Sequence, residues 1–424
     1  MHGEVRQERP ALPEIPRDDS LDATLAMARD PYGFIARRCR RLGTDLFQAR
    51  ILLRTTICMT GPDAARLFYD PRRFVRQGAP PGRIQKTLFG RGGVQELDGE
   101  AHRRRKGMFM GLVTPESVGR LIRMTSDGWS AYARKWTSME RVVLDDEARE
   151  ILTRAVCAWA GVPLDEDDFG RRTRQITSLF RNAGSIGPRR WRARWERRSA
   201  EAWIEGVVAA IRAGRLRPRE DSAAHVIATH RDLDGAPLAP RVAAVELLNV
   251  LRPTVATSVY VVFAAHALHR HPECRAKLQA GGSRYAHAFV QEVRRFYPFF
   301  PAVTAVVRED FEWNGHRFPA GARAMLDLYG TCHDRRVWEA PGDFRPERFL
   351  SREAGAFDLV PQGGGDPHLH HRCAGESLTV ELVKLALGVL AARIRYDVPE
   401  QDLRIDRTRL PALPRRALRV EQHP

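Results

Sequence analysis

The sequence predicts a mostly α-helical fold with small peripheral β-sheets, and three observations support this class. Apolar residues recur at helical spacing through most of the stretch from about 114 to 230. Residues 241–269 form the longest continuous apolar helix candidate of the chain. Strand-like segments are few, and they do not alternate with helices in the βαβ rhythm of a parallel sheet.

The N-terminal elements follow from proline, charge and apolar spacing. Residues 1 to about 18 are rich in proline and charge, and we expect a poorly ordered arm, ordered only by docking. Helical spacing of apolar residues runs from 21 to 41. Residues 46–60 carry a strand pattern that ends at the turn Gly61-Pro62. Pro62 then opens a helix, because proline suits the first helical turn.

The second half of the chain places a helix at 287–297 before another strand region. That region covers 302–318 and contains Asn314-Gly315, a strong hairpin signal. Glycine and proline then interrupt the chain between 340 and 367, and a final helix is expected from about 374 to 393. We find no internal repeat.

Composition limits the partners and the compartment. Lys and Arg total 69 against 52 Asp and Glu, so the net charge of +17 favours an anionic partner without choosing among nucleic acid, acidic membranes and small anions. The six cysteines form no CxxC pair and the N-terminus lacks an apolar signal segment, which indicates a reduced, cytoplasmic protein. The apolar stretch 254–268 is shorter than the ~20 residues of a membrane span, so we expect a core helix of a soluble protein without a transmembrane segment.

A glycine-rich loop before the last helix carries the first chemical signal. Three glycines follow Gln362 and let the backbone lie close to a flat ligand. Cys373 stands just before the helix, beside His371 and Arg372, where positive charge and the helix dipole favour a thiolate that can ligate iron. Two other interpretations stay open. The loop can simply hold a buried cysteine, or the histidines at 368, 370 and 371 can bind zinc.

Two further motifs point to a buried ionic network. Glu292 and Arg295 are three residues apart on one helical face, and Arg348 lies in the run Pro346–Phe349. Either motif alone is typical of a surface ion pair. Their order before the cysteine loop predicts one buried network of a carboxylate with two guanidinium groups.

The long apolar helix contains Arg252-Pro253 at its centre. Proline inside a helix removes a hydrogen bond and costs ~3 kcal/mol, so we expect a kink. An arginine among apolar residues is costly unless an anion pairs with it. Glu246, six residues earlier, lies on a different helical face. Arg252 therefore binds either an anionic ligand or an unidentified carboxylate of the protein.

Together these motifs resemble the cytochrome P450 superfamily of haem-thiolate enzymes. The resemblance implies the triangular, mostly α P450 fold over a single domain of residues 1–424, with haem b bound and Cys373 as the axial ligand of its iron. Two features depart from the usual pattern. Asp366 and Leu369 replace a phenylalanine and a glycine of the cysteine loop, and Arg252-Pro253 replaces the acid–alcohol pair that delivers protons.

These departures resemble one branch, the hydrogen-peroxide-dependent fatty-acid peroxygenases. Runs at 85–90, 94–106, 294–301 and 361–366 share the likeness, and those at 152–163 and 410–414 place the chain nearest the fatty-acid α-hydroxylases. The resemblance implies hydroxylation of fatty acids at the α carbon, with some β hydroxylation and minor decarboxylation to a terminal alkene. Hydrogen peroxide is the co-substrate, and no dedicated redox partner is required.

The same resemblance assigns roles to residues of the pocket. Arg252 binds the fatty-acid carboxylate, which then supplies the missing acid–base function, and Pro253 orients Arg252. Phe89 and Phe299 line the channel for the tail. Gln95 stands where decarboxylating relatives carry histidine, and its amide forms hydrogen bonds but does not titrate. A simple turn residue before Asp98-Gly99 is the alternative for Gln95.

Four cationic or titratable side chains are expected to hold the haem propionates: His102, Lys106, Arg76 and His371. The basic run 189–198 contains two tryptophans, which we expect to pack inward with the arginines in water, so nucleic-acid binding is not expected. The main alternative function is a conventional P450 monooxygenase that uses O2 and electrons from an acidic redox partner, which the net charge suits. A non-enzymatic haem- or nucleic-acid-binding regulator is a further alternative.

Overall fold

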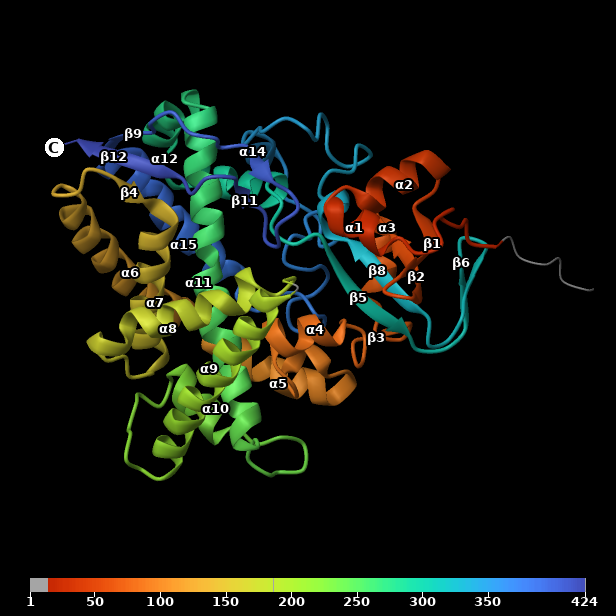
Figure 1. Cartoon of the computed structure of the whole chain (residues 1–424), viewed down its shortest axis with the longest axis horizontal. Coiled ribbons are helices and arrows are strands. Elements are labelled where there is room, and N and C mark those ends of the chain that lie inside the picture. The colour runs from red at the N-terminus through yellow and green to blue at the C-terminus, as the bar shows by residue number, and fades with distance from the viewer. Residues whose placement is uncertain (1–13, 186, 424) are drawn as a thin grey trace, which may run out of the picture.

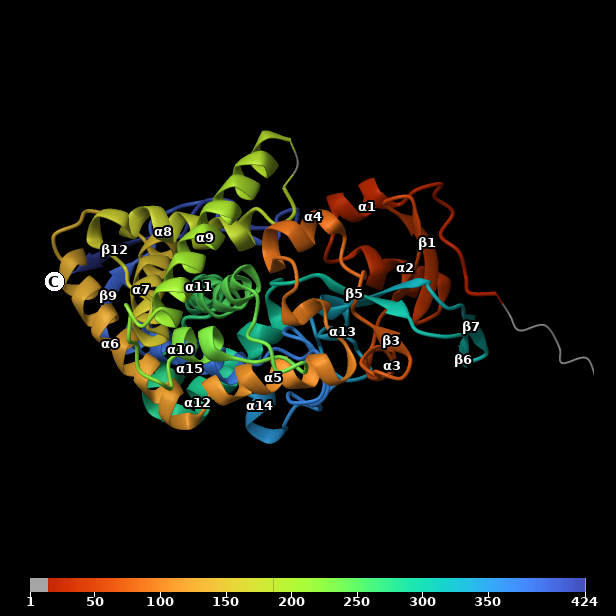
Figure 2. The ribbon, with the colours of Figure 1, turned by 90° about the horizontal axis from the view of Figure 1, so that it is seen from below.

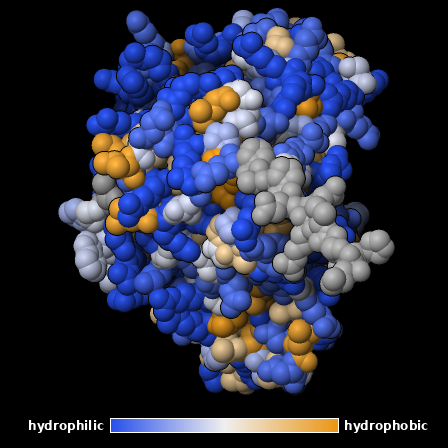
Figure 3. Space-filling view, turned by 90° about the vertical axis from the view of Figure 1, so that its right-hand side faces the viewer, coloured by the Kyte–Doolittle hydropathy of each residue, from blue (hydrophilic) through white to orange (hydrophobic). Residues whose placement is uncertain are grey.

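The computed structural model describes residues 14–185 and 187–423. Its helices surround one long helix, α11 (Pro240–Arg270), and the main β-sheet lies at one side of them (Figure 1). This arrangement confirms the predicted mostly α class with small sheets. The face seen in Figure 3 is largely hydrophilic, with apolar residues in small separate groups.

Most of the helices lie on the side of the molecule away from the main sheet (Figures 1 and 2). They are α5 (Gly99–Leu112), α6 (Pro115–Trp136), α7 (Leu144–Ala160), α8 (Glu166–Arg181), α9 (Pro188–Arg212), α10 (Ala223–Thr229), α11, α12 (Glu273–Phe296) and α15 (Glu376–Gly388), which continues as a π-helical turn, η3 (Val389–Arg393). The short elements that precede α5 are α4 (Gly82–Ile84), the π-helical turn η1 (Gln85–Phe89) and the 3₁₀ turn η2 (Val94–Glu96).

The main sheet has five strands in the order β1-β2-β8-β5-β3, of which only the pair β2–β8 is parallel. The strands are β1 (Leu46–Ile51), β2 (Arg54–Met59), β3 (Phe74–Val75), β5 (Ala302–Val307) and β8 (Arg323–Asp327). Beside it lie α1 (Thr24–Arg29), α2 (Phe34–Leu42) and α3 (Pro62–Phe68), which begins at Pro62 as predicted.

The remaining elements are short. β4 (Val142–Val143), β12 (Arg419–His423) and β9 (Arg395–Asp397) form a three-stranded sheet, and β10 (Ile405–Asp406) pairs with β11 (Leu413–Pro414). Strands β6 (Phe311–Trp313) and β7 (His316–Phe318) form the hairpin predicted at Asn314-Gly315, with φ values of 48° and 75° at the two turn residues. The helical turns α13 (Leu328–Thr331) and α14 (Arg348–Ser351) complete the chain.

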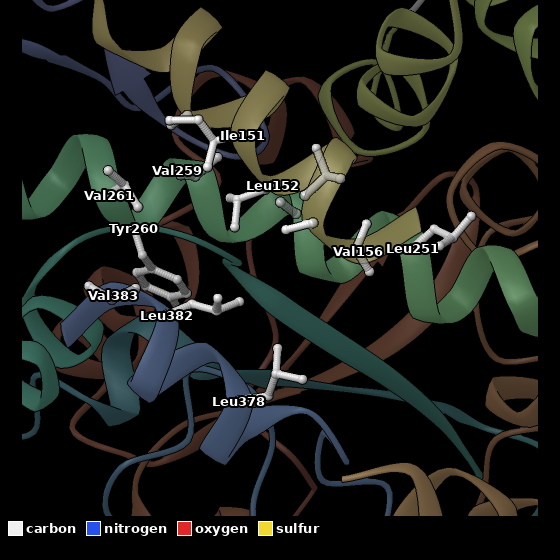
Figure 4. Packing of buried hydrophobic residues seen from close by; sticks show 14 of the residues in the cluster. Ile151, Leu152, Val156, Leu251, Val259, Tyr260, Val261, Leu378, Leu382 and Val383 are labelled. Carbon is white, nitrogen blue, oxygen red and sulfur yellow. The ribbon is translucent and has the colours of Figure 1, made fainter. Parts of the chain in front are cut away.

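The centre of the core lies along α11. Figure 4 shows α11 between α7 and α15, with Val259 near Ile151 and with Tyr260 directed toward Leu382 and Val383. A helix that is apolar on all sides is stable only when it is surrounded, and each fully buried aliphatic side chain contributes about 1.5–3 kcal/mol. Among the described residues, α11 is the one helix long and apolar enough to cross a membrane, but 94% of its most apolar window is buried inside the protein.

One local prediction needs correction. The strand pattern of 46–60 is a hairpin of β1 and β2, joined by Leu52 and Leu53 at φ 53° and 59°, a turn without the usual Asn-Gly signal. Helix α11 continues through Pro253, and the proline leaves the carbonyl of Asn249 without its usual donor. The kink expected at this point stays a prediction.

The predicted N-terminal arm is partly described. Residues 14–18 dock on β1: Ile15 is buried, and the Asp18 amide donates to the Gln48 carbonyl at 2.8 Å. The Asp18 carboxylate also pairs with Arg38. Residues 1–13 lie outside the described part of the chain.

Candidate functional site

The cysteine loop connects α12 and α15 through a short set of hydrogen bonds. The amide of Cys373 donates to the carbonyl of Gln362 at 2.9 Å, and the Gly375 amide donates to the Cys373 thiol. On the α12 side, Arg294 donates from Nε to Oε1 of Gln362 at 3.0 Å and also pairs with Glu376 of α15. These contacts fix Cys373 just before the first turn of α15.

The expected ease of ionisation of Cys373 is not observed. Burial raises the pKa of the thiol, and the hydrogen bond from Gly375 and the charges of Lys106 and Arg294 lower it by less. Arg372 does not compensate, because its guanidinium is turned to Glu376, with Nε 2.6 Å from Oε2. A bound metal cation would supply the missing positive charge, since coordination deprotonates a thiol.

The packing of the loop itself requires its three glycines. Gly363 has φ +93°, and a Cβ there would lie 3.0 Å from the carbonyl oxygen of His371. A Cβ on Gly364 would meet the carbonyl of Ala356 at 3.0 Å, and one on Gly365 would overlap the His370 ring. Protein atoms therefore leave no room for a side chain at these three positions, and contact of the loop with a flat ligand stays a prediction.

The predicted ionic network is present and deeply buried. Arg295 donates from Nε and Nη2 to the two carboxylate oxygens of Glu292 at 2.7 and 2.8 Å, and Nε of Arg348 lies 3.2 Å from Oε2. The side chains of Glu292 and Arg295 are both 0% exposed. Arg295 also donates to the carbonyls of Cys332 and Pro341, so the network joins α12 to the segment that precedes α14.

Replacing Glu292 with alanine should lower the free energy of unfolding by about 3–5 kcal/mol, because it leaves two buried guanidinium groups without an anion. The same change should prevent stable haem loading. Denaturant unfolding and Soret absorbance measure the two effects. Glu116→Ala removes an exposed ion pair with Arg120 and should cost less than about 1 kcal/mol. Equal effects of both substitutions would contradict a special role of the network.

Arg252 is a buried cation without an anionic partner. Its side chain is 6% exposed, its Nη1 donates to the carbonyl of Leu88, and the Phe89 ring lies 5.6 Å from its Cζ. Among the described residues no carboxylate lies within ion-pair distance of it. Burial lowers the pKa of Arg252 to about 9, and the charge of Arg197 acts in the same direction. Such a group is prepared to receive an anion.

The charged side chains nearest to Arg252 already have hydrogen-bond or ion-pair partners. Glu246 accepts from Nη1 of Arg105 at 2.7 Å and from the Val94 amide at 2.8 Å, so it does not serve Arg252. Arg197 of α9 pairs with Glu201 at 2.6 Å and donates to the carbonyl of Leu88 at 3.2 Å. Arg197 and Arg252 therefore share one backbone acceptor. This arrangement gives no support to the alternative of a protein carboxylate paired with Arg252.

Gln95 lies in η2 and also lines the main cavity. Its Oε1 accepts from Nδ2 of Asn249 at 3.2 Å, and the same Nδ2 donates to Oε2 of Glu246 at 2.9 Å. Because the oxygen of the amide is occupied, its NH2 group remains for other acceptors. The position of Gln95 is compatible with both roles that the sequence indicated, a turn residue and a residue of the pocket.

A cavity of about 1230 Å³ opens beside this site. Four of the predicted residues line it: Arg76, Phe89, Gln95 and His371. Arg252 adjoins it through Phe89, and Cys373 through the loop that carries His371. The neighbouring Phe300 lines the cavity, whereas Phe299 is not part of the lining and stacks on Tyr260 at 4.5 Å.

The predicted propionate partners gather next to the cysteine loop. The rings of His102 and His371 stack at 3.9 Å, and Lys106 donates to the carbonyl of Arg372. The guanidinium of Arg76 is buried and donates to the carbonyls of Phe68 at 3.2 Å and Thr304 at 3.4 Å, and the Arg76 amide donates to the carboxylate of Asp98 at 2.8 Å.

Burial dominates the pKa values of these side chains, although one carboxylate lies near them: Nε2 of His371 is 3.7 Å from Oδ1 of Asp98. Burial lowers the pKa of Arg76 to about 10 and that of Lys106 in the same direction. It also lowers the pKa of His102 to about 3 and that of His371 to about 4. These desolvated groups, with a thiol beside them, fit a planar iron cofactor that carries two carboxylates. A zinc site has no such support, because the described residues contain no group of three or more potential metal ligands.

Comparison with known proteins agrees with this geometry. The family model for cytochrome P450 matches residues 282–418. A putative cytochrome P450 137 of Mycobacterium tuberculosis is 30% identical over 173 residues, which cover 40% of this chain and 36% of that protein. Tabersonine 6,7-epoxidase isoform 1 of Catharanthus roseus is 33% identical over 27% of this chain and 23% of its own length. These curated relatives are thus matched over about a third of their length or less.

Solved structures match over nearly the whole chain. Cytochrome P450SP alpha (CYP152B1), solved with (R)-ibuprophen, is 51% identical and has a TM-score of 0.93, with 95% of this chain and 99% of that chain covered. Cytochrome P450EX alpha (CYP152N1), solved with myristic acid, is 43% identical at a TM-score of 0.94, with 96% and 99% covered. A variant of cytochrome P450 OleT, in complex with arachidonic acid, is 34% identical at 0.94, with 97% and 99% covered. With half of its residues identical along both chains, this protein belongs to the cytochrome P450 superfamily of haem-thiolate enzymes and, within it, to the CYP152 fatty-acid peroxygenases.

Proposed function

We propose that this chain hydroxylates fatty acids at the α carbon with hydrogen peroxide, with β hydroxylation and decarboxylation as minor reactions. The observation that carries the proposal is the buried Arg252 guanidinium, which has no carboxylate partner among the described residues. A fatty acid supplies that carboxylate. The fatty acids held by two of the solved relatives support the same substrate class.

The haem would be held by Cys373 and by the cluster of Arg76, Lys106, His102 and His371, in which the two histidines are neutral because burial lowers their pKa to about 3 and about 4. When bound, the haem would supply the oxidising chemistry with peroxide, and electron donation from the Cys373 thiolate would favour O–O cleavage. The Cys373 residue is half-buried, and the hydrogen bond from the Gly375 amide orients its sulfur.

Arg252 binds and orients the substrate. Its Nη1 is held by the Leu88 carbonyl, so its other N–H groups are left for a carboxylate, to which they make strong charge-assisted hydrogen bonds. With the head group fixed there, the α and β carbons are the nearest C–H positions to the reaction centre. We propose that Pro253 helps to set the direction of Arg252 from within the continuous helix α11.

The proton chemistry comes from the substrate. Helix α11 offers no acid–alcohol pair beside Arg252, and its Glu246 is engaged with Arg105. The bound carboxylate therefore accepts the peroxide proton and returns it to the departing oxygen, as a general acid–base catalyst. This explains why an arginine can replace an acidic residue at this point of the helix.

Product analysis after incubation of the haem-loaded protein with palmitic acid and hydrogen peroxide alone tests the function. We expect 2-hydroxypalmitic acid as the main product without any reductase. Turnover that requires O2, a reduced nicotinamide cofactor and a ferredoxin would instead favour the conventional monooxygenase.

We infer a cytoplasmic location, consistent with six cysteines that all remain free thiols.

Gln95→His should raise the share of terminal alkene several-fold without abolishing hydroxylation. Histidine adds a group that titrates near pH 6.5 at the cavity wall, whereas the amide of Gln95 stays neutral. Chromatography measures the alkene share of the products between pH 5.5 and 8. For Gln95→His this share should change at about pH 6.5. Gln95→Leu, which adds no titratable group, is the matched control and should not raise it. A wild type that yields mainly alkene would contradict this role of Gln95.

A further inference from the structure

Two tryptophans of the basic run lie on the outside of the protein, so the prediction that they pack inward is wrong. Trp191 and Trp195 of α9 are 71% and 63% exposed. Their spacing of four residues places them on one face of the helix. The buried stripe of α9 is instead built from smaller residues, such as Ala193, Ala200 and Ile204.

Three leucines form a second exposed apolar group. Leu21, Leu25 and Leu53 are 95%, 60% and 72% exposed. The segment before α1 is tied to the tip of the β1–β2 hairpin, because the Asp22 carboxylate accepts from the Leu53 amide at 3.0 Å. The Thr24 hydroxyl accepts from the neighbouring Leu52 amide at 2.6 Å, so the three leucines belong to one patch.

The hairpin tip is conformationally costly as well as exposed. Leu52 and Leu53 both have positive φ, a region that side chains other than Asn, Asp and Gly rarely adopt. A turn of this kind normally contains Asn-Gly. A strained leucine that points into water gains nothing for the fold, which indicates a use for its side chain at the surface.

The two apolar groups border the same opening. The lining of the main cavity includes Thr24, Met27 and Leu52 on one side, and Arg189 and Arg192 of α9 on the other. Figure 2 shows α1 and the first turns of α9 on the same side of the molecule. We call the exposed set Leu21, Leu25, Leu53, Trp191 and Trp195 the docking face.

Positive charge surrounds the docking face. Arg29, Arg50 and Arg54 are exposed beside the leucines, and Arg189 and Arg190 are exposed beside the tryptophans. None of these five arginines pairs with a carboxylate within the described part of the chain. Exposed leucine and tryptophan among unpaired arginines are typical of surfaces that lie in the interface of an anionic bilayer.

We propose that the docking face binds the surface of anionic lipid bilayers and directs the cavity opening toward the membrane. The inference rests on the proposed function for its substrate, since fatty acids partition into bilayers and can enter the cavity from there. A nucleic-acid surface would use the arginines and the tryptophan rings but would leave three exposed leucine side chains without a partner. The lipid surface accounts for all the residues of the docking face.

Co-sedimentation with vesicles tests the proposal without turnover. The haem-loaded protein is mixed with vesicles of phosphatidylcholine alone or with an equal share of phosphatidylglycerol, at low and high salt. Binding should require phosphatidylglycerol and weaken with salt. The double variant Trp191→Ser and Trp195→Ser should bind at least about tenfold more weakly. Leu53→Asn should also weaken binding, and asparagine tolerates the positive φ of the turn.

A matched control separates docking from general apolar exposure. Leu233, 52% exposed, lies between α10 and α11, and Leu233→Asn should leave vesicle binding unchanged. All variants should keep wild-type turnover of dispersed octanoic acid, so a failure of the proposed function appears as absent product while vesicle binding persists. The proposal is overturned by absent vesicle binding, by binding that the docking-face variants do not alter, or by preferred binding to a single-stranded oligonucleotide.

Discussion

Replacing Arg252 with alanine should reduce peroxide-driven oxidation of fatty acids by about 10²- to 10⁴-fold, the range that a lost general acid–base catalyst typically costs. The variant loses the anchor for the carboxylate and, with it, the group that moves the proton. Haem loading should survive, because Arg252 contacts the Leu88 carbonyl and the Phe89 ring rather than the cysteine loop. Product analysis and Soret absorbance measure the two quantities on one sample.

Two comparisons make the Arg252 result specific. Arg252→Lys keeps the charge but loses the planar fork of donors, so its activity should lie between those of the wild type and the alanine variant. Short carboxylic acids such as acetate should support oxidation of substrates without an acid group in the wild type, and much less in Arg252→Ala. Full activity of Arg252→Ala toward fatty acids would exclude the mechanism.

Cys373→Ala should abolish both peroxide-driven turnover and the carbon-monoxide difference band that marks thiolate ligation. The thiol lies in a loop fixed to α12 and α15, where no other cysteine is near in sequence. Difference spectroscopy of the reduced, carbon-monoxide-bound protein measures the band. Cys274→Ala, at a buried cysteine of α12, should leave the band intact. Retention of the band in Cys373→Ala would assign the ligand to a different residue.

Regular features of the fold were predictable because they depend on local patterns. Helix α11 follows from its continuous apolar composition, α3 from Pro62 and the β6–β7 hairpin from Asn314-Gly315. The turn at Leu52 and Leu53 could not be predicted, since leucine gives no local signal for positive φ. Both turn amides donate to side chains distant in sequence, that of Leu52 to Thr24 and that of Leu53 to Asp22.

The sequence predicts which side chains form the ionic network of the site, but not the pKa of the Cys373 thiol. The network of Glu292, Arg295 and Arg348 forms as expected. The pKa of the Cys373 thiol is raised because burial outweighs the nearby cations, and the extent of burial depends on the tertiary structure. The sequence could not indicate that the Leu88 carbonyl accepts a hydrogen bond from Arg252, because every residue has a main-chain carbonyl.

The shared acceptor at Leu88 has a consequence for substrate choice. Two guanidinium groups, those of Arg252 and Arg197, meet at one carbonyl oxygen, and only Arg197 has its own counter-ion. A fatty alcohol or a methyl ester of equal length would fill the channel but leave this like-charge contact unrelieved and the guanidinium desolvated. We therefore expect the pocket to discriminate against neutral lipids through the penalty of binding them, without any selective contact with the tail.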